Sequence, residues 1–390
     1  MKSYEELKPL IDQVIREKHA ELAALSDDLA DHPETALQEY ETSKKIAALL
    51  EKEGFAVEHP FAGYDTAFRG VYGDNRHRYK IALLTEYDAL PDIGHACGHN
   101  LSGAISILAG LALKDLQDAL DADIHIIGTP AEEDAGAKCR MSDEGIFKAY
   151  DMAMMVHLYD QNLIYCKLNG LASIMYQFHG KASHAGAMPW GGQNALNAAQ
   201  LMMHGIDCIR GCSHPDTRLN SIVVQGGFAG GSIPEETKVE TWIRHPDYPY
   251  LEKLMERVDH CAAGGALMAE CNWDKYHTAD VYKSMKRNAG GEAAIAEAFA
   301  ELGLPVNGDH EKLFGSSDIG NVSWECPAFH PTLQLAERGI AIHTREFLEC
   351  VKGEKARKCL EDGAKLIAYA VAKIFTDEER IKQMKADFEA

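Results

Sequence analysis

The sequence predicts an α/β protein whose mainly parallel sheet is interrupted by an inserted α+β domain. Short apolar runs alternate with stretches of helical periodicity as far as about residue 158, a pattern typical of a parallel sheet with helices on both faces. Near Leu171 the order changes to strand–helix–strand–strand–helix, which indicates a second architecture. The chain has 390 residues and is 46% hydrophobic, so it is long and apolar enough for two domains.

The first part of the chain begins with two expected helices. Apolar side chains recur at helical spacing over residues 3–30, and a second helix over residues 41–53 ends before Gly54. Four apolar runs are expected as strands: 80–84, 125–128, 152–156 and 340–342. The helix expected over residues 101–116 is small and apolar on most faces, and we therefore expect it to be buried.

The inserted domain is expected over residues 171–281. Its predicted elements are a strand at 174–178, a helix at 194–210, strands at 221–225 and 238–244, and a helix at 250–269. The flanking segments 1–170 and 282–390 then form one domain together, and a long helix is expected over residues 353–375.

Charge and hydropathy restrict the partners and the compartment. The formal net charge is −21, which argues against nucleic acid and anionic membranes as partners. No apolar run is long enough for a membrane span, and the acidic N-terminal segment has no apolar signal-peptide core. We expect a cytoplasmic protein that acts on a small molecule.

Metal-binding types of side chain follow each of the four apolar runs, and carboxyl ends of strands are where open α/β sheets bind ligands. They are Cys97, His99, Glu132, Glu133, His157 and His343. Taken singly, each is more often structural: a solvated carboxylate pair, or a histidine of the core or of a loop. Together they predict a metal site. A thiolate with imidazoles favours zinc, and manganese or cobalt are the alternatives.

The adjacent carboxylates suggest two roles. One of Glu132 and Glu133 can bind metal while its neighbour accepts a proton from water. Asp88, ahead of the first motif, is expected to accept a hydrogen bond from a ligand imidazole. The alternative for Asp88 is a capping residue of a turn or helix.

Several motifs resemble those of the M20 family of metallopeptidases and amidohydrolases, in particular its aminoacyl-amidohydrolase branch. The resemblance rests on His95-Ala96-Cys97-Gly98-His99-Asn100, Gly128-Thr129-Pro130-Ala131-Glu132-Glu133 and His343-Thr344-Arg345-Glu346-Phe347. Asn100 and residues 317–323 favour the sub-branch of the aminobenzoyl-glutamate hydrolase B subunit and the M20 dipeptidase-like proteins. Further matches follow in family order over almost the whole chain, at 32–34, 180–185, 192–195, 226–227, 233–234 and 315–323.

The resemblance implies a two-metal catalytic domain with an inserted lid domain that also forms a homodimer. The matching metal ligands are Cys97, His99, Glu133, His157 and His343. Glu132 matches the general base. His184 matches a histidine that reaches from one subunit's lid toward the other subunit's active site; the alternative is a plain surface histidine.

The same resemblance suggests substrate-binding residues. Arg244 matches an arginine that meets a substrate carboxylate, with a structural salt bridge as the alternative. Asn194 and Ser232 are the other candidates. The chain departs from the family at Gly231, where relatives usually carry an asparagine that contacts substrate. Recognition is therefore altered, or Ser232 takes over.

The expected activity is hydrolysis of the amide bond of an N-acyl or N-aminoacyl amino acid. The substrate would be an aminobenzoyl-glutamate-like conjugate or a dipeptide. The alternatives are a deacetylase, a carbamoyl-amino-acid hydrolase, and a non-catalytic metal-dependent binding protein. Glu132 beside Glu133 argues against the last, because metal binding alone does not require a base.

Overall fold

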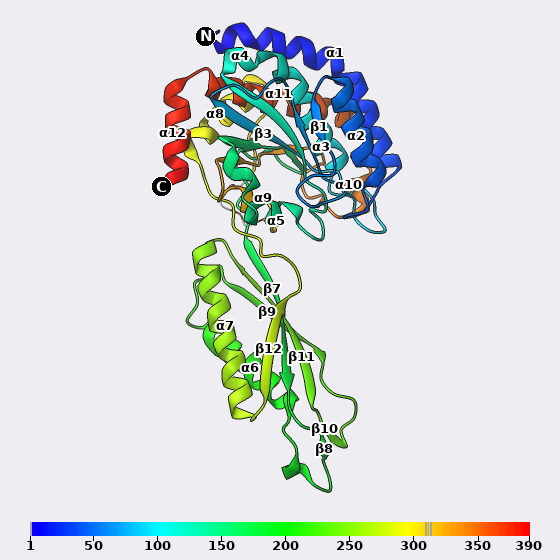
Figure 1. The fold of residues 1–390 in the computed structure, drawn as a ribbon, viewed down its shortest axis with the longest axis vertical. Coiled ribbons are helices and arrows are strands. Elements are labelled where there is room, and N and C mark those ends of the chain that lie inside the picture. The colour runs from blue at the N-terminus through cyan, green and yellow to red at the C-terminus, as the bar shows by residue number, and fades with distance from the viewer. Residues whose placement is uncertain (1, 309, 311, 313) are drawn as a thin grey trace. The chain divides into compact units, whose positions relative to one another are not determined.

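The chain leaves its first core near Leu168, builds a second one, and returns to the first near Met285 (Figure 1). The computed structural model describes residues 2–308, 310, 312 and 314–390. Unit 1 consists of the chain up to Lys167 and from Met285 onward, and unit 2 is Leu168–Ser284. The boundaries expected from the sequence lie at residues 171 and 281.

Unit 1 contains a six-stranded sheet in the order β1-β2-β4-β3-β5-β13. The pairs β4–β3, β3–β5 and β5–β13 are parallel, whereas β1–β2 and β2–β4 are antiparallel. The mainly parallel sheet is therefore confirmed. The chain continues from β5 into β6 and from β13 into β14, and β6 and β14 form a separate parallel pair. The strands are β1 (Ala56–Glu58), β2 (Phe68–Val71), β3 (Tyr79–Thr85), β4 (Ala122–Gly128), β5 (Met152–Met154), β6 (His157–Tyr159), β13 (Ala328–Phe329) and β14 (Thr332–Gln334).

The helices of unit 1 are α1 (Tyr4–Asp31), α2 (Tyr40–Lys52), α3 (His99–Leu113), α4 (Gln117–Leu120), α5 (Ala137–Asp143), α8 (Ala289–Glu301), α9 (Ile319–Val322), α10 (Arg345–Leu348), α11 (Glu354–Phe375) and α12 (Glu378–Glu389), with short 3₁₀ turns at Lys114–Leu116 and Ile146–Ala149. Every residue of α3 is buried, as predicted, because α3 packs between strands β3 and β4 and helices α1 and α11. A Cβ at Gly103 would lie 2.4 Å from the Glu86 carbonyl oxygen. Glycine thus lets α3 approach the end of β3 and brings His99 to the strand ends.

The strand predicted at residues 340–342 is wrong. This segment is a loop in which Ile340 and Ile342 pack against the core, and that packing explains the apolar pattern. His343 follows in a turn at φ 64°. Its N–H donates to the Ala96 carbonyl at 2.9 Å, which brings the turn next to Cys97.

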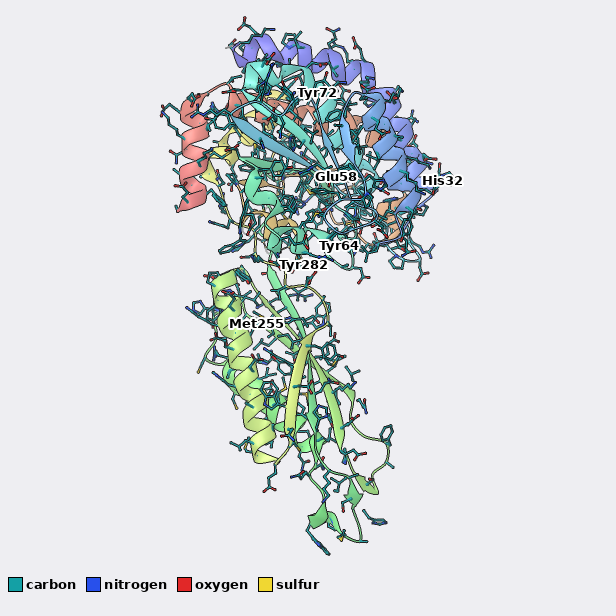
Figure 2. All side chains as sticks on the ribbon, in the orientation of Figure 1. His32, Glu58, Tyr64, Tyr72, Met255 and Tyr282 are labelled. Carbon is teal, nitrogen blue, oxygen red and sulfur yellow. The ribbon has the colours of Figure 1, made fainter. Side chains whose placement is uncertain are left out.

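Unit 2 is a four-stranded antiparallel sheet in the order β12-β7-β11-β9. Helices α6 and α7 pack on each other and on β7 and β11, and Met255 of α7 is labelled in Figure 2. The predicted strand–helix–strand–strand–helix order missed β12, because most of its side chains are polar and exposed. The elements are β7 (Gly170–His179), β8 (Ser183–His184), a 3₁₀ turn (Pro189–Gly191), α6 (Ala195–Arg210), β9 (Arg218–Gln225), β10 (Ser232–Ile233), β11 (Glu236–His245), α7 (Tyr248–Met268) and β12 (Asn272–His277).

Across the described part of the chain, no helix combines the length and the apolar character needed to cross a membrane.

Candidate metal centre

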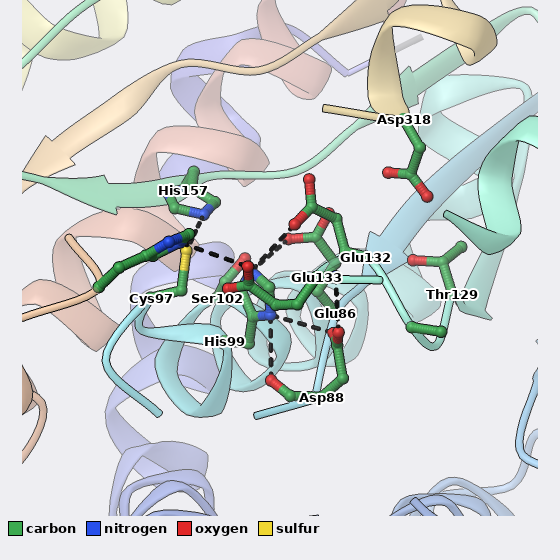
Figure 3. A network of polar contacts seen from close by, with 12 residues as sticks. Glu86, Asp88, Cys97, His99, Ser102, Thr129, Glu132, Glu133, His157 and Asp318 are labelled. Carbon is green, nitrogen blue, oxygen red and sulfur yellow. Dashed lines mark hydrogen bonds and ion pairs between the residues drawn. The ribbon is translucent and has the colours of Figure 1, made fainter. Parts of the chain in front are cut away.

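All six metal-type residues predicted from the sequence meet at the strand ends of unit 1. Figure 3 labels Cys97, His99, Glu132, Glu133 and His157 among them. The loop before α3 supplies Cys97, and α3 itself begins at His99. The loop after β4 supplies the paired carboxylates. Three donor groups form, and within each the ligand atoms lie within 4.8 Å of one another: Cys97, His99 and His157; Cys97, Glu133 and His343; His99, Glu132 and Glu133.

Left-handed backbone at three positions aims these side chains. Gly98 at φ 83° turns the chain between Cys97 and His99, a conformation that glycine adopts without a Cβ penalty. Ala131 at φ 60° and His343 at φ 64° adopt the same region as ordinary L-residues, which costs energy and is common at functional sites. The Ala131 N–H donates to the buried Glu39 carboxylate at 2.9 Å, and this bond holds the turn ahead of Glu132.

Asp88 connects the two main segments of the centre. Its Oδ1 lies 3.0 Å from His99 Nδ1, and its Oδ2 accepts a hydrogen bond from the Glu133 N–H at 2.9 Å. Because Nδ1 is engaged, the other ring nitrogen, Nε2, is the one left to face the cluster. A carboxylate behind a ligand imidazole orients the ring and makes it more basic.

The remaining donors also converge. His157 Nε2 lies 3.4 Å from Cys97 Sγ, while its Nδ1 lies 2.8 Å from the Leu158 carbonyl. His343 Nε2 lies 3.3 Å from Glu133 Oε2, and the His343 side chain is 47% exposed, so the cluster is accessible from that side.

The donor set fits divalent metal ions. Glu133 Oε1 is a buried ligand atom without a hydrogen-bond partner, and His99 Nε2 forms no hydrogen bond either, although carboxylate oxygens of Glu86 and Glu132 lie 3.3 Å and 4.0 Å from it. Such atoms are suited to bind a metal ion. One thiol, three imidazoles and two carboxylates are donors that zinc accepts, and the nitrogen and oxygen donors also suit manganese and cobalt.

The neighbouring carboxylates are in different electrostatic environments. Burial raises the pKa of Glu132, and the nearby charges of Glu86 and Asp318 raise it further. Burial also acts to raise the pKa of Glu133, but the His343 hydrogen bond and the His99 charge outweigh burial and lower it to about 2. The two side chains are therefore suited to different roles.

Three buried neighbours of this centre were not predicted from the sequence. Lys138 forms ion pairs with Glu86 and Asp318, and all three side chains are fully buried. Glu86 carried a signal, because it lies two residues before Asp88 at the end of β3. Lys138 carried none.

A fourth missed residue is His330, which directly follows β13 and could have been found by the same strand-end argument. Its ring centroid lies 5.4 Å from that of His157, and both of its ring nitrogens are buried without a hydrogen-bond partner.

The candidate substrate residues and His184 belong to unit 2. His184 is exposed in β8, opposite Ser232 of β10, and its Nδ1 accepts hydrogen bonds from the Gly186 and Ala187 N–H groups. In the neutral ring, Nε2 then carries the proton and is a donor.

Asn194 and Arg244, two candidate substrate-binding residues, also make contacts within unit 2. The Asn194 side chain caps α6 by accepting from Leu196 N and Asn197 N. The half-buried Arg244 guanidinium lies over the Trp242 ring at 5.0 Å, and burial lowers its pKa.

A mainly parallel α/β sheet with a thiol, imidazoles and paired carboxylates at its strand ends defines a metal-dependent hydrolase. Residues 82–373 match the sequence profile of peptidase family M20/M25/M40. The chain belongs to this family, which confirms the resemblance seen in its motifs and identifies it as a metal-dependent amide hydrolase.

Several curated relatives match nearly the whole chain, among them a dipeptidase and a hydrolase subunit. The identity to the Xaa-Arg dipeptidase of Mus musculus is 29% over 398 residues, covering 98% of this chain and 92% of the relative. The identity to the B subunit of p-aminobenzoyl-glutamate hydrolase from Escherichia coli (strain K12) is 25% over 467 residues, covering 98% of this chain and 95% of the relative.

A solved M20 peptidase of Bacillus subtilis, described as dinuclear metal-binding, superposes with a TM-score of 0.69 at 19% identity, covering 92% of this chain and 98% of that one. At this identity the likeness shows the fold alone.

Proposed function

We propose that this chain is a two-metal amidohydrolase or dipeptidase. Cys97, His99, Glu133, His157 and His343 would hold two divalent cations, with zinc favoured and manganese or cobalt as alternatives. The observation that carries the proposal is the overlap of the three donor groups, which share Cys97, His99 and Glu133 pairwise. Five such ligands are too many for one open catalytic zinc.

Glu132 would act as general base and then as general acid. Bound cations would polarise the scissile carbonyl and favour ionisation of water. Glu132 Oε2 lies 4.0 Å from His99 Nε2, beside the ligands. From there the carboxylate takes a proton from the attacking water and passes it to the leaving amine as the C–N bond breaks.

The proposed substrate is an N-acyl or N-aminoacyl amino acid with a free α-carboxylate, such as a dipeptide or an aminobenzoyl-glutamate-like conjugate. The names of the two curated relatives support this class. Arg244, Asn194 and Ser232 are the proposed substrate contacts. We further propose a cytoplasmic homodimer joined through unit 2, with His184 acting on the partner subunit's substrate.

A substrate panel tests this proposal. Protein reconstituted with zinc, manganese or cobalt would be assayed with aminobenzoyl-glutamate, acyl-amino acids and dipeptides, including dipeptides with C-terminal arginine. Hydrolysis that a chelator abolishes and the metal restores is the expected result. Cleavage of only N-acetyl or N-carbamoyl amino acids would favour the alternative activities. Metal binding without any hydrolysis would favour a binding protein.

A further inference from the structure

Lys138 is a fully buried lysine at the start of α5. A buried ammonium costs several kcal/mol unless carboxylates compensate it. Its Nζ lies 2.8 Å from Glu86 Oε1 and 2.6 Å from Asp318 Oδ1. Its backbone N–H also donates to Asp318 Oδ2 at 3.0 Å. Asp318 therefore fixes both the main chain and the side chain of Lys138.

The two partners of Lys138 form a fourth donor group with Glu132. Ligand oxygens of Glu86, Glu132 and Asp318 lie within 4.8 Å of one another, the same spacing as in the three groups of the metal centre. Three carboxylates this close repel one another unless a cation lies among them. Here the ammonium of Lys138 binds two of the three, so the protein supplies the cation itself.

Glu86 connects this corner to the metal centre. Its Oε2 lies 3.3 Å from His99 Nε2, while its Oε1 is held by Lys138. Glu132 Oε2 lies 4.0 Å from the same nitrogen. A displacement of Glu86 would therefore change the surroundings of His99, a proposed metal ligand, and of Glu132, the proposed base.

We propose that Lys138 is a built-in cation of the active site. Its ammonium occupies the corner formed by Glu86, Glu132 and Asp318, excludes a further metal ion from it, and holds Glu86 and Glu132 in their working positions. Lys138 is a positioning residue and does not touch substrate. The part that concerns Glu132 rests on the proposed function; the part that concerns metal exclusion does not.

The test compares Lys138→Ala with Lys114→Ala. Lys114 is a matched control, since it is a largely buried lysine of unit 1 paired with Glu53 at 3.1 Å. Bound Mn²⁺ per chain is measured by elemental analysis of desalted protein, and kcat and KM with whichever panel substrate the wild type cleaves. We expect Lys138→Ala to bind one more Mn²⁺ than the wild type, and to lose kcat by about 10²-fold with KM little changed, as for misplaced catalytic groups. Lys114→Ala should match the wild type in both.

The triple variant E86Q/K138M/D318N separates function from stability. A neutral, well-packed replacement of a buried ion network is usually tolerated by the fold. We expect this variant to fold and to bind no additional ion, because two of the three carboxylates of the corner are neutral. We expect its kcat to stay low, because no ammonium holds the side chains at positions 86 and 132 in place. A wild-type kcat and ion count in Lys138→Ala would overturn the proposal. If Lys138→Ala fails to fold, a wild-type kcat in the triple variant would overturn it.

A different result is expected if the proposed function itself is wrong. The wild type itself would then cleave no panel substrate, while the ion counts of the variants could still be compared.

Discussion

Glu132 and Glu133 are neighbours in the chain, yet their surroundings give them different tasks. The Glu133 carboxylate lies 3.3 Å from His343, and its N–H is held by Asp88. Glu132 instead shares a corner with the carboxylates of Glu86 and Asp318. The strained turn at Ala131 precedes both, so the backbone directs one carboxylate to the ligands and the other to the edge of the cluster.

The first prediction concerns Glu132. Glu132→Gln should keep the fold and the metal content but lose turnover by roughly 10²–10⁴-fold, the usual cost of removing a general base. Steady-state kinetics and metal analysis of the same sample measure both. Glu144→Gln, on the exposed C-terminal side of α5, is the control and should be unaffected. Near-normal turnover of Glu132→Gln would remove this residue from the mechanism.

The second prediction concerns Glu39, whose buried carboxylate accepts hydrogen bonds from Thr66 and from the Ala131 N–H. Burial, with a further contribution from the charge of Asp88, raises its pKa from the usual 4.5 to about 7, although those two hydrogen bonds favour the ionised form. The folded state favours the protonated carboxyl of Glu39. This contribution to the free energy of unfolding is complete below the unfolded pKa of 4.5 and is lost as the pH rises through about 7.

Glu39→Gln cannot ionise. Its amide oxygen can still accept from the Ala131 N–H, and its NH2 group can donate to the Thr66 hydroxyl, which reverses the direction of that hydrogen bond. Near pH 8 it should therefore be more stable than the wild type, by about 1–3 kcal/mol, and near pH 5 the advantage should shrink strongly. Thermal unfolding of both proteins at the two pH values measures this. An equal difference in Tm at both pH values would show that ionisation of Glu39 does not matter.

At the scale of elements, parallel neighbours explain why the sequence could predict most of the centre. Strands β3, β4 and β5 pair in parallel, so the segments that follow them meet at one edge of the sheet. This brings Cys97, His99 and the paired carboxylates together. His343 instead lies in a loop, and its N–H donates to the Ala96 carbonyl. The sequence therefore predicted His343 as a metal-type residue but wrongly placed it after a strand.

Other elements could not be predicted from local pattern. Strand β12 is an exposed edge strand whose polar residues show no apolar alternation, and it forms because β7 offers it a partner. Lys138 resembles any polar helix residue in the sequence. Its burial depends on Asp318, which is 180 residues away along the chain and is brought close only by the fold.

The third prediction concerns two adjacent glycines of α7. A Cβ at Gly264 would meet nothing within 4 Å, whereas at Gly265 it would lie 2.5 Å from the Ala198 carbonyl oxygen of α6. Gly264→Ala should stabilise the protein by up to about 1 kcal/mol through helix propensity. Gly265→Ala should destabilise it by about 1–3 kcal/mol, because α6 and α7 must separate. Urea unfolding measures both, and equal effects would contradict the close approach.

At the scale of the whole molecule, the chain places its metal-type residues in one unit and His184 in the other. The Nδ1 atom of His184 is engaged by backbone N–H groups, so an exposed Nε2 donor remains for a ligand. A donor of this kind can stabilise the oxyanion of a tetrahedral intermediate. The proposed homodimer would deliver it to the partner subunit's substrate.

The fourth prediction tests that delivery by complementation. His184→Ala and Glu132→Gln should each be inactive as homodimers. A mixed dimer would contain one site with both defects and one with neither, so subunit exchange should restore up to about a quarter of wild-type activity for random pairing. Mass spectrometry confirms the exchange. If exchange occurs and no activity returns, His184 does not act across an interface.

The central claim is that overlapping donor groups around Cys97, His99 and Glu133 bind two metal ions for amide hydrolysis. The most direct measurement titrates metal-free protein with Zn²⁺ or Mn²⁺ and follows bound metal per chain and turnover in the same samples. We expect turnover to reach its maximum only when two ions are bound per chain. Full turnover with a single ion per chain, or with none, would contradict it.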